Sequence, residues 1–167
     1  DAMPVILFAA TEQGYGKLMD LVSRAFLETP AGEPPHIMLS WLDFGADGLI
    51  GLTGGERGPV GQALAVGDRE LAERRLTRLG ALLPDRLYVE LSRHRGYDRA
   101  LERATLELAV ALDLPIVATN EAFFASAADF EAHDALIAIA EGSVIAEDKR
   151  RRLTPDHHLR SAADMAV

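Results

Sequence analysis

The sequence predicts an α/β fold in which parallel strands alternate with helices. Four short apolar runs lack the polar alternation of a half-exposed strand, and they lie at 4–9, 49–53, 86–91 and 115–119. Such continuous runs are typical of strands covered on both faces. Stretches with helical spacing separate the runs, which suits right-handed crossovers within one sheet. Each run ends in polar residues or glycines, where α/β proteins place ligands and catalytic groups.

Composition sets the class of protein. A length of 167 residues with 49% hydrophobic residues predicts one globular domain. The chain has no cysteine, so it offers neither a disulfide nor a thiolate metal site. A net charge of -9 makes it a poor sole platform for nucleic acid. Because no apolar run approaches the roughly 20 residues of a membrane span, we expect a cytoplasmic protein without a membrane partner.

The first half of the chain contains one clear amphipathic helix. It follows a turn predicted at Gly14 and Gly16, and its predicted inner side carries Leu18, Leu21, Val22, Ala25 and Phe26. Prolines predict a loop over 29–36, and one helical turn is expected over 40–44. The glycine-rich end of the second strand, at 53–58, predicts a tight turn. A cradle of backbone N–H groups for an anion is the alternative.

The second half continues the alternation. Short helices are expected at 59–66 and after Asp68, which is a plausible N-cap, and a longer one at 98–113. Leucine and alanine recur at helical spacing and predict which side of each helix faces inward. For the helix after Asp68 these residues are Ala72, Leu76, Leu79 and Leu83, and for the helix at 98–113 they are Leu101, Ala104, Leu108, Ala111 and Leu112. Ser126 and Asp129 resemble a capping box that opens a helix ending near Gly142. A solvated charged loop is expected at 147–152, and Ser161 with Asp164 suggests a further cap.

Both ends of the sequence are unusual for a complete domain. Asp1 directly precedes a buried-type strand, and Val167 follows shortly after the signal that starts a helix. We therefore expect a piece excised from a longer polypeptide.

An ordered set of motifs resembles one protein family. The set is Leu7-Phe8-Ala9-Ala10 with Gly14-Tyr15, Leu52-Thr53-Gly54-Gly55, Leu87 to His94, Leu114 to Glu121, Glu131 to Leu136, and Arg150 to Pro155. In this order it resembles the polymerase and histidinol phosphatase (PHP) domain of bacterial DNA polymerase III alpha subunits, the replicative polymerases. The resemblance covers nearly the whole chain. It implies a partial (β/α) barrel of PHP type, the second half of a seven-stranded domain, with residues 1–167 as a single domain.

The resemblance also implies a site that has lost its metals. Metal-binding members of the family carry ligands at positions that are here Pro4 and Gly55, and their final Asn-Asp-x-His motif reads Asn120-Glu121-Ala122-Phe123. Proline, glycine and phenylalanine side chains cannot ligate a metal. The remnant site at the strand ends would consist of Gly55, Glu90, His94, Asn120, Glu121 and Phe123, with no catalytic residue, no metal and no cofactor.

Single residues of this remnant admit plainer interpretations. Glu90 ends a strand, and we favour a hydrogen-bonded carboxylate over a ligand or general base. For His94 we favour a turn-capping or solvated role, and for Asn120 an amide that ties loops together. His133 has the spacing of a core-edge residue. Neighbouring histidines on a helix do not share a face, so His157 and His158 are not expected to chelate together.

Three functional hypotheses follow. In the first, implied by the resemblance, the chain is a non-catalytic scaffold of the replicative polymerase that docks the separate proofreading exonuclease subunit and meets DNA only through the parent. The alternative is a metal-dependent phosphoesterase or 3′–5′ exonuclease that uses Glu12, Glu90, His94 and Glu121. A weaker third hypothesis is an anion-binding module at 53–55. The isolated piece is expected to self-associate, because the strand at 5–8 would have an unpaired edge. Apolar surface would also be uncovered on whichever face points inward, from among Ile6, Phe8, Leu52, Val89 and Val117. The competing expectation is that loops and the terminal segment 143–167 fold over the gap.

Overall fold

A computed structural model describes residues 2–43, 45–94, 96–147 and 149–166. Asp1, Phe44 and Val167, and one residue of the predicted charged loop, lie outside the described residues. The chain divides into two compact units. Unit 1 comprises residues 1–91 and 99–117, and unit 2 comprises residues 92–98 and 118–167. The single domain predicted for 1–167 stays a prediction.

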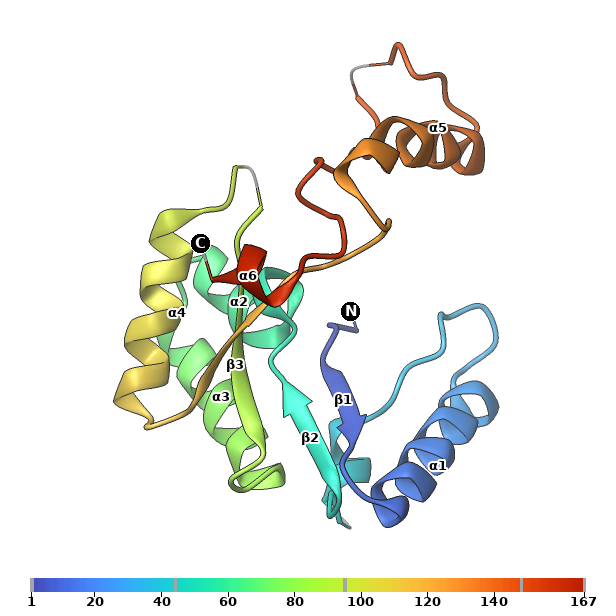
Figure 1. Cartoon of the computed structure of the whole chain (residues 1–167). Helices are drawn as coiled ribbons and strands as arrows, with labels where there is room; N and C mark the ends of the chain where they lie inside the picture. Colours follow the sequence, from blue (N-terminus) through green and yellow to red (C-terminus); the bar gives the residue numbers. More distant parts are fainter. Residues whose placement is uncertain (1, 44, 95, 148, 167) are drawn as a thin grey trace. The chain divides into compact units, whose positions relative to one another are not determined.

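Strands and helices alternate as the sequence predicts (Figure 1). The order is β1 (Ile6–Ala9), α1 (Glu12–Glu28), the short 3₁₀ helix η1 (Leu39–Leu42), β2 (Leu49–Leu52), η2 (Gly55–Arg57), α2 (Pro59–Ala65), α3 (Arg69–Leu82), β3 (Leu87–Ser92), α4 (Arg99–Ala111), β4 (Ile116–Thr119), η3 (Ala127–Asp129), α5 (Phe130–Glu141) and α6 (Ala162–Met165). The α/β class is confirmed.

The four strands form one open sheet in the order β1-β2-β3-β4, consistent with part of a (β/α) barrel. Strands β2 and β3 are parallel, with Gly51 opposite Leu87 and Leu52 opposite Tyr88. The expectation that all four strands are parallel is wrong for β1, which pairs antiparallel with β2. A continuous apolar run indicates that a strand is buried, but not whether it pairs parallel or antiparallel with its neighbour. The long connection between β1 and β2 allows either arrangement.

The sheet buries one face more fully than the other. Leu49, Leu87 and Val89 belong to a core that also takes Leu76 and Leu79 of α3. On the opposite face of β1, Ile6 and Phe8 are exposed, as the sequence analysis expects. The expectation that Leu52 and Val89 are uncovered is wrong, because both are buried.

Helix boundaries follow local chemistry in most places. The Asp68 side chain accepts a hydrogen bond from the Leu71 N–H at 2.9 Å, so it caps α3 as predicted. Ser126 and Asp129 form the predicted capping box, and Gly142 ends α5 with φ 64°. In α4, Leu108 is buried as expected, whereas Ala111 is exposed.

Helix α1 differs from its prediction in two ways. Gly14 and Gly16 lie inside the helix rather than in a preceding turn, because Thr11 caps it and accepts from the Gly14 N–H at 3.1 Å. A Cβ on Gly14 would lie 2.0 Å from the Gly48 carbonyl oxygen, so only glycine fits this contact. Val22 and Phe26, assigned to the inner side, are exposed.

Candidate functional site

The start of β1 and the ends of β2 and β3 lie together in unit 1. Because β1 runs antiparallel to β2, its start at Pro4 lies beside the end of β2. Gly54 adopts φ 79°, and a Cβ there would lie 2.0 Å from the Pro4 carbonyl oxygen. The end of β3 joins them, because the Glu90 N–H donates to the buried Thr53 hydroxyl at 3.0 Å. The structure thus brings Pro4, Gly54 and Glu90 to one edge of the sheet.

The glycine pair after β2 makes the tight turn that the sequence favours. Gly54 precedes η2 in a left-handed conformation, and Gly55 follows at φ 58°. The Gly58 N–H donates to the Gly55 carbonyl, which closes the turn. Helix α2 begins directly after it with proline at its first position.

Two buried polar side chains, Thr53 and Glu90, lie at this edge. Glu90 is buried, whereas proline and glycine supply no side-chain donor. Glu12, which the metal-dependent hypothesis includes, is exposed in the first turn of α1. A catalytic zinc needs about three protein ligands and a structural one about four. The residues gathered here therefore do not fit a metal centre of the kind the family carries.

Unit 2 holds the other predicted positions, and here a network of hydrogen bonds joins two segments. The Asn120 side-chain amide donates to the His158 carbonyl. The Phe123 N–H donates to the His157 carbonyl and the Leu159 N–H to the Phe124 carbonyl, each at 2.9 Å. The role predicted for Asn120, tying loops together, is confirmed.

Aromatic rings fill the space beside this network. The His94 ring stacks on the His157 ring, with centroids 3.9 Å apart and 14° between the planes. Phe123 lies 6.0 Å from both His157 and His133, and the Phe124 ring lies 5.3 Å from His133. Phe123 thus takes part in an aromatic cluster.

The surroundings of His94 favour the neutral form of its ring. Burial lowers the pKa of His94, and the neighbouring charges of His157 and Arg160 lower it further, whereas Asp156 opposes them. The His157 Nδ1 accepts from the Thr154 N–H at 3.1 Å. The solvated or turn-capping role predicted for His94 is wrong, because its ring is part of this stack and its Nδ1 is buried without a hydrogen-bond partner among the described residues.

The remaining predicted positions do not add a ligand set. Glu121 is exposed. His158 does not face the same partner as His157, because its Nδ1 lies 2.8 Å from the Pro155 carbonyl. Across residues 2–43, 45–94, 96–147 and 149–166, no group of three or more His, Asp or Glu side chains is arranged to hold a metal ion.

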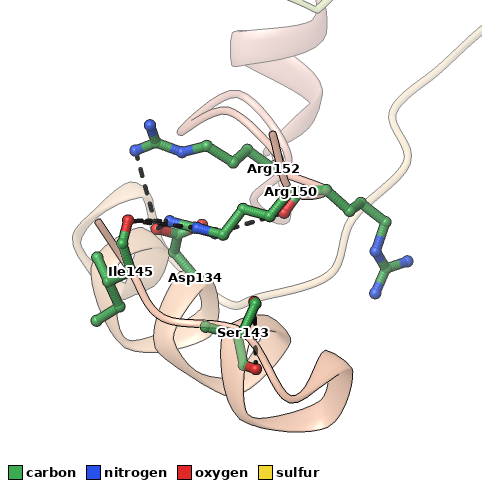
Figure 2. Close-up of polar contacts among 7 residues, drawn as sticks. Asp134, Ser143, Ile145, Arg150 and Arg152 are labelled. Atoms are coloured by element: carbon green, nitrogen blue, oxygen red, sulfur yellow. Dashed lines mark hydrogen bonds and ion pairs between the residues drawn. The ribbon is translucent and has the colours of Figure 1, made fainter. Parts of the chain in front are cut away.

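One buried ion pair was not predicted from the sequence (Figure 2). The Arg150 guanidinium binds both oxygens of Asp134 in α5, at 2.6 and 2.5 Å, and the exposed fractions of the two side chains are 1% and 7%. Arg150 also donates to the Ile145 carbonyl, which fixes the loop after α5. The hydrogen bonds from Arg150 hold the pKa of Asp134 below its usual value, and Arg152, 3.9 Å away, acts in the same direction.

This pair corrects the prediction of a solvated loop at 147–152. Lys149, Arg151 and Arg152 are exposed, but Arg150 is an internal anchor. A signal existed in the sequence, because Asp134 shares helical spacing with the buried Ile137 and Ala138. A carboxylate on a buried helix face requires a cationic partner.

Comparison with known proteins places the chain. The PHP domain family matches residues 1–94. DNA polymerase III subunit alpha of Caulobacter vibrioides is 38% identical over 98% of this chain, that of Vibrio cholerae 37% over 95%, and that of Escherichia coli K12 35% over 95%. The chain spans only 14% of the length of each of these relatives.

Proposed function

The chain belongs to the PHP domain family, and from this premise we propose that it is a non-catalytic scaffold within a bacterial DNA polymerase III alpha subunit. DNA-directed DNA synthesis would be the activity of the whole polymerase. This part would stabilise that polymerase and dock the proofreading exonuclease subunit. It would need no cofactor and would meet DNA only through the parent.

The observation that carries the proposal is the extent of the similarity. Identities of 35–38% extend over 95–98% of this chain and involve proteins named as polymerase alpha subunits. The whole described chain, not one motif, therefore corresponds to a segment of such subunits. A cytoplasmic location accompanies the proposal, since that is where bacterial DNA is copied. Within the described residues, no helix is long and apolar enough to cross a membrane.

The chemistry of the strand ends supports a scaffold over an enzyme. Pro4, Gly55 and Phe123 offer no side-chain donor for a metal. Phe123 instead packs near His133 and His157. Ring contacts of this kind stabilise a domain but supply neither a nucleophile nor a Lewis acid. We therefore propose that the segment is free of metal in the working protein.

Docking of the exonuclease is tested with the full-length polymerase encoded by the same gene. The purified polymerase is mixed with the exonuclease subunit from the same genome and passed over a sizing column. We expect the two to elute together, and we expect co-elution to be lost when residues 1–167 are exchanged for the matching segment of a PHP domain from an unrelated phosphatase. A polymerase that still extends primers but binds the exonuclease equally well after the exchange would contradict the docking role.

The alternative activity is tested in parallel. A metal-dependent phosphoesterase would release phosphate from a nucleotide or an aryl phosphate in the presence of Mn²⁺ or Zn²⁺, and would lose that activity in Glu90→Gln. We expect no release above the blank.

A further inference from the structure

Segment 154–159 of unit 2 is attached to two other segments of the same unit. Backbone hydrogen bonds and one isolated parallel bridge hold it against segment 120–124. The ring of His157 stacks on the ring of His94, with centroids 3.9 Å apart, and this contact attaches it to segment 92–98. A pairing of two short extended segments is marginally stable in water by itself. The attachment of 154–159 therefore depends on the histidine stack.

The two histidines differ in the surroundings of their Nδ1 atoms. The His157 Nδ1 accepts from the Thr154 N–H at 3.1 Å and lies 3.2 Å from the Thr154 carbonyl oxygen, to which a protonated ring can donate. The His94 Nδ1 is buried and has no hydrogen-bond partner among the residues that the structure describes. A proton on that atom would be a charged donor without an acceptor, which is costly in a buried position. The closed stack thus tolerates a protonated His157 better than a protonated His94.

The charges around His94 act mainly against its protonation. Burial is the largest cause that lowers the pKa of His94, and His157 and Arg160 lower it further, whereas Asp156 raises it. The Arg160 guanidinium lies 3.5 Å from the Asp156 carboxylate, so part of that negative charge is already paired. Phe123, whose ring lies 6.0 Å from that of His157, brings no charge from segment 120–124.

We propose that the stack of His94 on His157, here called the histidine clasp, opens in mild acid and releases segment 154–159. In the open form His94 is solvated and takes the ordinary histidine pKa of about 6.5. Because the pKa of His94 is lower in the closed form, the stabilisation of the clasp is complete above about pH 6.5. It is lost as pH falls toward the lowered pKa. The clasp therefore makes the order of segment 154–159 sensitive to pH.

Linkage sets the size of the effect. Below about pH 6.5, and as long as His94 stays neutral in the closed form, each pH unit shifts the equilibrium toward the open form by up to about tenfold. The open form should therefore be up to about ten times more populated at pH 5.5 than at pH 8. This inference concerns unit 2 alone and does not rest on the polymerase assignment. A clasp that stays closed in acid would leave the proposed function unaffected.

Hydrogen exchange followed by mass spectrometry tests the opening. The 167-residue chain is labelled at pH 8, 7 and 5.5 with EDTA present, and exchange rates are corrected for the intrinsic rate at each pH. We expect protection of segment 154–159, where the Leu159 N–H donates to the Phe124 carbonyl, to fall by up to about tenfold between pH 8 and pH 5.5. Helix α3 is the internal reference. Unchanged protection of 154–159, or an equal fall in α3, would overturn the proposal.

Variants of the two rings identify the group that titrates. His94→Phe keeps an aromatic ring without a titrating nitrogen, so segment 154–159 should stay protected at all three pH values. His94→Ala removes the ring, so protection should be low even at pH 8. His157→Phe keeps His94 and should retain the fall in acid. Circular dichroism spectra confirm that each variant is folded. Wild-type pH dependence in His94→Phe, or its loss in His157→Phe, would refute the role of His94.

Discussion

Replacing Leu108 by alanine tests whether α4 packs on the core as described. Leu108 is 1% exposed and belongs to the same core as Leu76, Leu79 and Val60. The substitution removes three carbon atoms, which at about 0.8 kcal/mol for each buried methylene amounts to about 2.4 kcal/mol. Any cavity that remains adds to this, up to about 5 kcal/mol in total. Alanine is an excellent helix former, so helix propensity does not contribute to the loss.

Urea unfolding followed by circular dichroism measures the effect. With a slope of about 2 kcal/mol per molar urea, the midpoint should fall by roughly 1–2.5 M. Val110→Ala is the matched control on the same helix, because Val110 is 74% exposed. We expect the control to change stability by less than about 0.5 kcal/mol. Equal midpoints for the two variants would refute the packing of α4 described here.

Three further predictions concern the site and its supports. Calorimetry with Zn²⁺ or Mn²⁺ should show no stoichiometric binding, and tight binding that Glu90→Ala abolishes would contradict this. Gly14→Ala should destabilise the chain by about 1–3 kcal/mol in thermal unfolding, because the added Cβ meets the Gly48 carbonyl at 2.0 Å. The pair of Asp134 and Arg150 should make stability fall in acid: since the folded pKa of Asp134 is lowered, its contribution is complete above about pH 4 and is lost as pH falls through that lowered pKa.

Matched variants separate these effects from general damage. Gly16→Ala adds the same methyl group in the same helix, where no described atom outside the backbone of α1 is near, and it should not destabilise the monomer. Asp134→Asn should flatten the acid limb of the urea midpoint between pH 5 and pH 2. An unchanged limb in Asp134→Asn would show that other carboxylates dominate.

The alternation of strands and helices was predictable because burial and helical spacing are local properties of the sequence. The direction of β1 was not, because apolar runs at 4–9 and 49–53 are compatible with either pairing. Val22 and Phe26 were assigned to the core for a related reason. An apolar side chain at helical spacing reports a buried face, but not whether this chain or another one buries it.

The candidate site was predictable in its positions more than in its contacts. Asn120 fits its predicted role because a side-chain amide at a strand end has few other uses. Arg150 was misjudged because four basic residues were treated as one solvated run. Arg150 differs from the adjacent basic residues because its side chain is buried and paired with Asp134. This pairing depends on how the loop folds back onto α5, which the sequence alone does not reveal.

The central claim is that this chain is a scaffold without chemistry of its own. The most direct measurement is the release of nucleotide from a 3′-labelled DNA strand by the purified chain with Mn²⁺, compared with its Glu90→Gln variant. The account predicts no release above the blank for either protein. Release by the wild-type chain that disappears in Glu90→Gln would show a working hydrolytic site and contradict the claim.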